Sequence, residues 1–433
     1  MINEANYRTD NLPQDSITLA DVSYKELFTD PLLVDYIDQG LQNNIDIRVA
    51  LQQIISAEAY LKQGKAAFLP SVEAGAQYTH QELSANSQFG SLFSSLDQYQ
   101  LTGSLSWEAD IWGKIRSNKR AFQASYLQSV AAHQAVKSRL VADIASTYYN
   151  LLSLDTQLRI TEETVSNREN SLETTSALKD AGSVTEVAVK QTEAQLYTAQ
   201  ALVIDLKMQI KILENTMSIL LGTEPTEIPR GNLEGQNITS DLPVGVPVSL
   251  LRNRPDVVAA EYAYMNAFEL TNAARSNFYP SLTISATGGF QSLDPAELLD
   301  TNSLFATLIG GLTQPIFNKR QIKTQYEVSE SQQEQARLNY RQAILTATKD
   351  VSDALYSYEA ATAKIEVKRK EYDAYGLATS YSEELLNNGL ANYLEVLTAR
   401  ENALNSALGL VTTRNNQLQA VVDLYVALGG GWQ

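Results

Sequence analysis

The 433-residue sequence contains no cysteine and only two histidines, His80 and His133. Without cysteine the chain has no disulfide, no thiolate nucleophile and few of the ligands that build zinc sites. Neither histidine has a neighbour at metal-ligand spacing, so we expect no metal site and no cofactor. No nucleophile, base and orienting group form a recognisable catalytic set, so we expect no enzyme.

Positive charge and long apolar runs are both scarce. The chain has 33 Lys and Arg against 50 Asp and Glu, a formal net charge of −17. No basic face is visible, which argues against nucleic acid as a partner. No run of 18 apolar residues occurs, so the sequence offers no transmembrane helix. The polar start, MINEANYRTD, does not read as a signal peptide and predicts either a cytosolic chain or a mature terminus.

Proline is missing from two long windows, and glycine is rare in their helical parts. No proline occurs in residues 71–224 or 316–433, and Gly182 is the only glycine in 114–221. Because proline breaks helices and glycine weakens them, these windows predict long helical segments. The predicted helices cover residues 32–67, 114–181, 183–221, 249–277, 319–388 and 390–428.

The chain also repeats itself. Residues 44–81 align with 254–291 at a constant offset of 210, and Gly182 matches Gly389 at an offset of 207. A repeat of this length predicts two copies of one module. Each module consists of a helix, a strand hairpin, a long helix, a glycine break and a shorter helix.

The repeat divides the chain into five parts. They are an N-terminal segment (1–31), a first repeat (32–221, hairpin 71–108), an insert (222–248), a second repeat (249–428, hairpin 281–313) and a C-terminal tail (429–433). The insert is rich in turn residues, which predicts an irregular belt; a flexible linker is the alternative.

The segment QYQLTGSLSW, residues 98–107, alternates apolar or small residues with polar ones. A period of two predicts a strand with one apolar and one polar face. Strands of this kind are predicted over 71–81, 98–108, 281–291 and 304–313, the last with Phe305 and Ile309 on its polar face. Strands of about ten residues cross a bilayer when tilted. Aromatic residues near their ends predict an interfacial girdle of Tyr78, Tyr99, Trp107 and Phe290.

Four strands are too few to close a barrel, because eight is the practical minimum. An open sheet in lipid leaves backbone groups unpaired, so we expect several chains to share one barrel. The long helices would each span about 100 Å, which matches the two shorter helices of each module placed end to end. The alternatives are a soluble sheet packed on a core and a soluble coiled-coil interaction protein.

Several motifs resemble those of the TolC-type outer-membrane efflux proteins, in particular the OprM-like branch that serves resistance–nodulation–division (RND) pumps. SLLRNRPDVVAAE, at 249–261, is similar to that branch's LLxxRPDVxxAE signature. FLPSV and FYPSL each precede a strand, DIWGK enters the first long helix, and NNGLANYLEVLTARENAL follows the second. The resemblance runs from about residue 32 to residue 428.

The resemblance implies a mainly α fold with a β-barrel contribution. A homotrimer would share a twelve-stranded outer-membrane barrel, continuous with a long α-helical periplasmic barrel and a mixed equatorial belt. The implied function is a passive duct for small molecules in a multidrug efflux system, in contact with outer-membrane lipid. Its partners would be a periplasmic adaptor and an inner-membrane RND pump. A duct for type I protein secretion is the alternative. The branch usually begins with a lipidated cysteine, whereas this sequence begins with Met1.

The resemblance also implies a gate just after the second glycine break. Gly182 and Gly389 are expected near this tip, because each follows a long helix. Leu394 stands at the position of the family's apolar ring, and Glu395 and Thr398 stand where members carry aspartates. Three copies of Glu395 around an axis would repel one another and attract cations. The alternatives are a solvated surface carboxylate for Glu395 and ordinary helix packing for Leu394.

Overall fold

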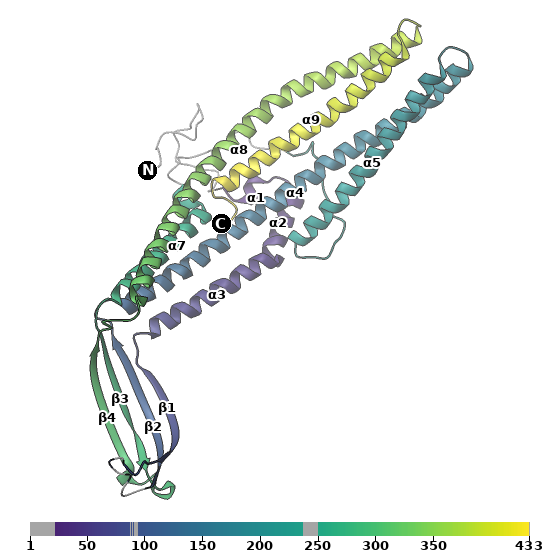
Figure 1. Ribbon diagram of the computed structural model, residues 1–433. Helices are drawn as coiled ribbons and strands as arrows, with labels where there is room; N and C mark the ends of the chain where they lie inside the picture. Colours follow the sequence, from purple (N-terminus) through teal and green to yellow (C-terminus); the bar gives the residue numbers. More distant parts are fainter. Residues whose placement is uncertain (1–21, 87, 89, 91–93, 237–249, 433) are drawn as a thin grey trace. The chain divides into compact units, whose positions relative to one another are not determined.

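The computed structural model describes residues 22–86, 88, 90, 94–236 and 250–432, so most of the predicted N-terminal segment and the second half of the insert lie outside the described residues. The described chain consists of helices and one sheet (Figure 1). The helices are α1 (Tyr24–Leu27), α2 (Pro31–Asn43), α3 (Ile45–Ala66), α4 (Lys114–Asp180), α5 (Glu186–Leu220), α6 (Leu250–Asn253), α7 (Pro255–Ser276), α8 (Gln321–Asn387) and α9 (Tyr393–Ala427). The strands are β1 (Ser71–Glu82), β2 (Ser95–Ala109), β3 (Ser281–Ser292) and β4 (Leu304–Thr313), and two short 3-10 turns, η3 (Pro295–Glu297) and η4 (Thr301–Ser303), precede β4.

Matching elements of the two copies have equal lengths. Helices α3 and α7 both have 22 residues, and strands β1 and β3 both have 12. Helices α4 and α8 both have 67 residues, and α5 and α9 both have 35. The two copies of the sequence repeat therefore fold alike, apart from β2 and β4, which have 15 and 10 residues. The five-part division of the chain stays a prediction.

The single helix predicted over 32–67 is wrong, because the chain breaks at Asn44. The backbone N–H of Asn44 donates to the carbonyl of Gly40 at 2.9 Å and closes α2. Its side-chain Oδ1 accepts from the N–H groups of Asp46, at 2.9 Å, and Ile47, at 3.3 Å. An Asn side chain that accepts from the first amides of a helix is a favourable N-cap. Asn44 thus ends one helix and begins the next.

The single helix predicted over 249–277 is also wrong, and the break occurs at the matching residue, Arg254. Pro255 opens α7. Proline has no N–H to donate and restricts the residue before it, so it is tolerated at a helix start but not inside one. Helices α5 and α9 begin three residues later than predicted, because Thr185 and Asn392 act as their N-caps.

The four strands form one antiparallel sheet in the order β1-β2-β3-β4. The pairing sets Leu105 between Val72 and Ala286, with Leu308 beyond Ala286. Apolar residues of all four strands therefore share one face, and the Gln, Thr and Ser residues share the other. Strand β4 carries Phe305 and Ile309 on the polar face, as the sequence predicts.

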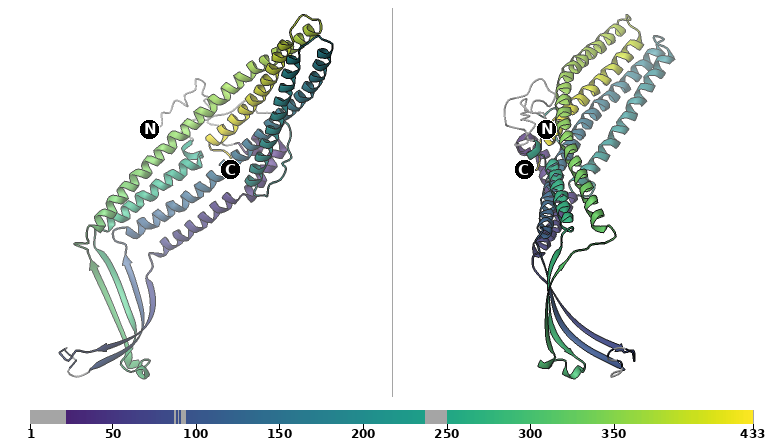
Figure 2. Two further views of the ribbon diagram at one scale, coloured as in Figure 1. Left: turned by 45° about the vertical axis from the view of Figure 1, so that its right-hand side comes forward. Right: turned by 60° about the vertical axis from the view of Figure 1, so that its left-hand side comes forward.

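The described chain forms two compact units. The described residues of unit 1 are 22–52, 130–236, 250–259 and 341–432, and its core contains fully buried Ile144, Tyr148, Leu151 and Tyr425. Unit 2 comprises Gln53–Ser129 and Ala260–Tyr340, and it holds the sheet and the helix segments that join its strands (Figure 2).

The sheet of unit 2 covers no core of its own. Every residue in β1, β2, β3 and β4 is at least partly exposed, including the apolar ones. The alternative of a soluble sheet packed on a core is therefore not supported by the described residues. Among the described residues, no helix combines the length and the hydropathy needed to cross a bilayer.

Candidate functional site

The apolar face of the sheet is the first candidate site. Val72, Leu308 and Leu312 have exposed fractions of 73%, 76% and 68%. Scattered exposed apolar residues are ordinary, but a contiguous apolar face marks an interaction surface. Polar residues on the opposite face, such as Gln100 and Gln291, hydrogen-bond to each other across strands at 3.2 Å. The sheet therefore exposes one apolar face and one polar face.

The predicted girdle residues lie at both ends of this sheet. Tyr78 and Tyr99 face each other across β1 and β2 with their ring centroids 5.0 Å apart, near the end where the hairpin turns. Phe290 pairs with Leu101 and lies toward the same end. Trp107 lies toward the helices, where its Nε1 donates to the carbonyl of Phe68 at 2.9 Å.

Sequence reasoning missed a further aromatic pair at the helix end of the sheet. Trp112 stacks on Tyr279 with ring centroids 4.7 Å apart. Its Nε1 donates to the carbonyl of Pro280 at 2.8 Å, so the ring is fixed although half exposed. The segment DIWGK contained this tryptophan, but it lies after the alternating pattern ends.

Gly182 and Gly389 end the two long helices with the same backbone geometry. Their φ angles are +75° and +70°, the left-handed region that favours glycine. The N–H of Ser183 donates to Leu178 O, and that of Leu390 donates to Leu385 O, both at 2.8 Å. This pattern is a Schellman C-cap, which satisfies the last carbonyls of a helix and reverses the chain.

The predicted gate residues lie on one exposed face at the start of α9. Leu394 is 52% exposed, and Glu395 and Thr398 are exposed beside it. The hydroxyl of Thr398 donates to the carbonyl of Leu394 at 2.9 Å. The opposite face packs on α5, where the hydroxyl of buried Tyr393 hydrogen-bonds to Thr192 at 2.7 Å. Packing inside this chain therefore does not account for the exposed Leu394.

Val187 is the residue that sequence reasoning overlooked here. It occupies the second position of α5, just as Leu394 does in α9, and it is 64% exposed. The offset of 207 that relates Gly182 to Gly389 also relates Val187 to Leu394. The repeat alone was therefore enough to find it.

Partly buried polar contacts join the helices of unit 1 beside a cavity of about 840 Å³. The guanidinium of Arg168, only 5% exposed, donates to Glu401 at 2.7 Å and ties α4 to α9. Arg400 donates to Glu383 at 2.8 Å and to Ser171, and so ties α9 to α8 and α4. Nothing in the local sequence pattern marks Arg168 or Arg400, because Glu401 and Ser171 lie more than 200 positions away from them.

The described part of the insert, 222–236, is fixed to unit 1 by charged groups. Arg230 donates to Glu214 at 2.8 Å and to both oxygens of Asp155. Lys211 also pairs with Glu214, at 2.9 Å. Burial alone would raise the pKa of Glu214, but the hydrogen bonds from Arg230 and Lys211 outweigh it and lower that pKa. In this stretch the insert is docked on unit 1, and the belt stays a prediction.

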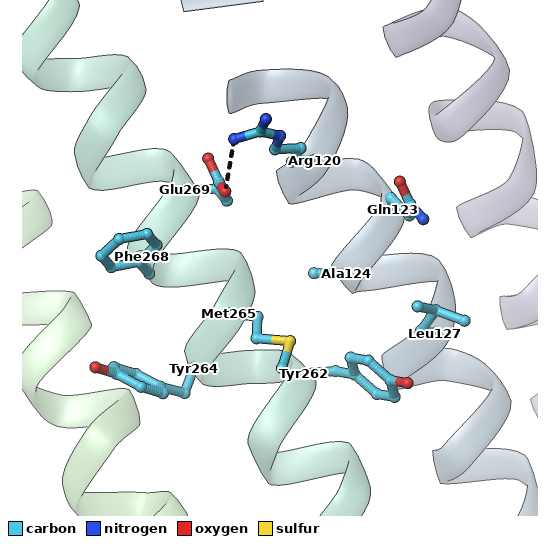
Figure 3. A pocket seen from close by; sticks show the side chains of 9 residues that line it. All are labelled: Arg120, Gln123, Ala124, Leu127, Tyr262, Tyr264, Met265, Phe268 and Glu269. Carbon is cyan, nitrogen blue, oxygen red and sulfur yellow. Dashed lines mark ion pairs between the residues drawn. The ribbon is translucent and has the colours of Figure 1, made fainter. Parts of the chain in front are cut away.

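A groove of about 460 Å³ lies between α4 and α7 in unit 2 (Figure 3). Met265 lies between the two helices, and an ion pair of Arg120 with Glu269 at 3.5 Å closes one end. Phe268 and Tyr264 lie along the same helix as Met265. No residue singled out from the sequence lies in this groove. Within the described residues, no group of His, Asp and Glu is arranged to hold a metal ion.

Comparison with known proteins gives consistent matches. The family model described as outer membrane efflux protein matches residues 36–223 and 246–430. The solvent efflux pump outer membrane protein SrpC of Pseudomonas putida is 30% identical over 97% of this chain and 89% of its own length. The probable outer membrane lipoprotein SilC of Salmonella typhimurium is 27% identical over 98% of this chain and 92% of its own. The crystal structure of a membrane protein from Pseudomonas aeruginosa superposes with a TM-score of 0.90 at 25% identity, over 98% of this chain and 97% of that one.

Proposed function

Because this chain belongs to the outer membrane efflux protein family, we propose that three copies of it form a passive duct that carries small molecules out of the cell. The chain is an outer-membrane efflux protein with the fold of the TolC-type channels. Members of this family form trimers and serve as outer-membrane components of efflux pumps. In the proposed assembly, each copy contributes four strands to a twelve-stranded barrel.

The sheet carries the proposal of a shared barrel. Its apolar face has no cover in the described chain, and its two outer strands, β1 and β4, each pair with one neighbour only. Backbone groups at such edges are not tolerated in lipid, so the edges must meet other strands. Three sheets of four strands exceed the eight needed for closure. The apolar face then meets lipid and the polar face lines water.

We further propose that the duct joins a periplasmic adaptor and an inner-membrane RND pump. The RPD signature at 254–256 and the similarity to a solvent efflux protein favour small-molecule efflux over type I protein secretion. In the proposed duct no side chain needs a catalytic role, because conduction is passive. The tryptophan and tyrosine residues of the girdle, with Trp112 and Tyr279, would lie at the two water–lipid boundaries.

Leu394, Glu395 and Thr398 are proposed to narrow the duct just after the Gly389 turn. Three copies of their exposed face would meet around the axis of the trimer. Val187, the equivalent position of the first repeat, would add three more apolar side chains. The carboxylates of Glu395 would favour cations over anions.

Planar-bilayer recording tests this gate. In the variant Leu394→Ala/Glu395→Ala we expect a higher single-channel conductance and a weaker preference for cations. The matched control, Leu377→Ala/Glu366→Ala, removes the same side-chain types from exposed positions inside α8 and should leave both properties unchanged. If conductance and selectivity of the gate variant equal those of the unmodified protein, these residues do not form the gate.

A further inference from the structure

Basic residues are distributed unevenly along unit 2. The strand hairpins, 71–107 and 281–313, contain no Lys or Arg. The four segments where strands meet helices, with the adjoining helix turns included, contain ten Lys or Arg and only two Asp or Glu, in a chain whose net charge is −17. These segments are 62–70, 108–120, 271–280 and 314–323, and we call their basic residues the junction collar. Almost a third of the chain's positive charge therefore lies in about a tenth of its length.

Hydrogen bonds hold the four segments next to one another. Trp107 of β2 donates to Phe68, and Trp112 donates to Pro280. The side-chain amide of Gln314 donates to the carbonyl of Phe278 at 3.1 Å. Figures 1 and 2 show the ends of α3, α4, α7 and α8 at the same end of the sheet. The collar is therefore one surface of unit 2.

The collar's charges are accessible. The side chains of Arg116, Arg320 and Lys323 have exposed fractions of 57%, 63% and 62%. Each makes an ion pair with an Asp or Glu, but exposed pairs contribute little and are readily exchanged. Four further members have no ion-pair partner in the part of the chain that the structure describes: Lys65, Lys119, Arg275 and Lys319.

Apolar side chains accompany the charges. Ile316 and Phe317, just before Lys319, are 98% and 87% exposed, and Trp112 is 49% exposed. Unit 2 leaves Ile316 and Phe317 almost uncovered, whereas one face of Trp112 stacks on Tyr279. A surface that combines aromatic and aliphatic groups with long basic side chains suits the headgroup region of a bilayer, where the apolar parts enter lipid and the charges remain in water.

We propose that the junction collar binds the phosphate groups of anionic phospholipids in the periplasmic leaflet of the outer membrane. This inference rests on the proposed function, which places the sheet in the membrane and the helices in the periplasm. A lipid surface is favoured over a protein partner because the collar continues directly from the apolar face of the sheet. Basic side chains close to an anionic leaflet each strengthen its attraction.

Quenching of tryptophan fluorescence by brominated lipids tests the collar. The protein, with Trp432→Phe to remove the tryptophan outside unit 2, is reconstituted into phosphatidylcholine vesicles. The vesicles contain either brominated phosphatidylglycerol or brominated phosphatidylethanolamine. Trp107 and Trp112 then report which lipid lies beside the collar.

The test variant is Lys319→Gln/Arg320→Gln/Lys323→Gln. The control, Lys364→Gln/Arg369→Gln/Lys370→Gln, removes three exposed charges farther along the same helix.

We expect stronger quenching by the brominated phosphatidylglycerol in the unmodified protein and in the control. In the test variant, the ratio of quenching by brominated phosphatidylglycerol to quenching by brominated phosphatidylethanolamine should fall at least about fivefold. Added salt should lower this ratio in the unmodified protein. Equal quenching by the two lipids, or a preference that the test variant retains in full, would overturn the inference alone. Quenching by neither lipid would show that the sheet is not in the membrane and would overturn the proposed function as well.

Discussion

At the scale of single residues, Arg230 shows how a loop segment becomes part of the folded body. Its guanidinium is mostly buried and contacts two carboxylates, Asp155 on α4 and Glu214 on α5. A buried charge that loses its partner is strongly destabilising, so the three residues depend on one another. Arg230 therefore helps to hold the described part of the insert in place, together with the buried side chains of Ile228 and Leu233.

The lowered pKa of Glu214 gives a prediction for acid conditions. Glu214→Gln should reduce the free energy of unfolding by about 2 kcal/mol at neutral pH, because it removes a charged hydrogen-bond acceptor of Arg230. The lowered pKa means that the ionised carboxylate stabilises the fold above its ordinary value of 4.5. This contribution disappears as the pH falls through the lowered pKa. Denaturant unfolding followed by circular dichroism should therefore show the variant and the unmodified protein converging in acid.

The control for this prediction is Glu58→Gln, which breaks an exposed ion pair with Lys62. We expect it to change stability by less than about 1 kcal/mol, because exposed pairs contribute little. A difference between Glu214→Gln and the unmodified protein that stays constant from neutral pH into acid would contradict the assigned role of Glu214.

At the scale of elements, helix ends depend on single capping residues. The helices of both repeats stop at left-handed glycines and restart at Thr185 and Asn392, whose side chains accept hydrogen bonds from the first amides. A helix interior, by contrast, tolerates many residue types. The ends are therefore the positions where one substitution should have the clearest effect.

Gly389 and Gly376 provide a matched comparison at this scale. A methyl group added at either residue meets no other atom within 4 Å, so packing does not distinguish them. Gly389 has a φ of +70°, whereas Gly376 lies inside α8. Gly389→Ala should lower the free energy of unfolding by about 1 kcal/mol, because alanine is strained in the left-handed region. Gly376→Ala should raise it by about 0.5–1 kcal/mol, because alanine favours helix.

Thermal unfolding of the two variants in detergent measures this comparison directly. The midpoints are expected to move in opposite directions from that of the unmodified protein. If both variants shift the same way, backbone conformation is not what separates the two glycines.

At the scale of the whole molecule, the sheet explains why one chain is incomplete. It has no buried residue, an uncovered apolar face and two edges that each pair on one side only. Lipid can cover the face, but only other strands can satisfy the edges. The folded unit is therefore expected to be the assembly rather than the single chain.

Light scattering of the purified protein tests this expectation. In detergent we expect a protein mass about three times the 47.7 kDa of one chain. Without detergent the protein should aggregate, because the apolar faces of the strands remain exposed. A monodisperse single chain that stays soluble without detergent would exclude the shared barrel.

Features that depend on neighbouring residues were predicted from the sequence, whereas features that depend on residues far apart in the chain were not. Strand alternation is local, so β4 was predicted with its observed bounds and the other strands to within three residues. The break at Asn44 was missed because asparagine occurs both inside helices and at their caps, and only its contacts decide which role it has. The contacts of Arg168 with Glu401 and of Arg400 with Ser171 join residues more than 200 positions apart and leave no local pattern. The sequence of one chain does not show how the proposed gate closes, because closure needs side chains from other copies.

The equal lengths of the paired helices restrict how this chain can change in evolution. One residue inserted into α4 would turn everything after it by about 100° around the helix axis and move it by about 1.5 Å. Such an insertion would bring buried side chains to the surface, and α4 would no longer have the same length as α8. Insertions and deletions should therefore accumulate where the hairpins turn, the place where the two repeats already differ. Homologues of different length are expected to differ there rather than within the helices.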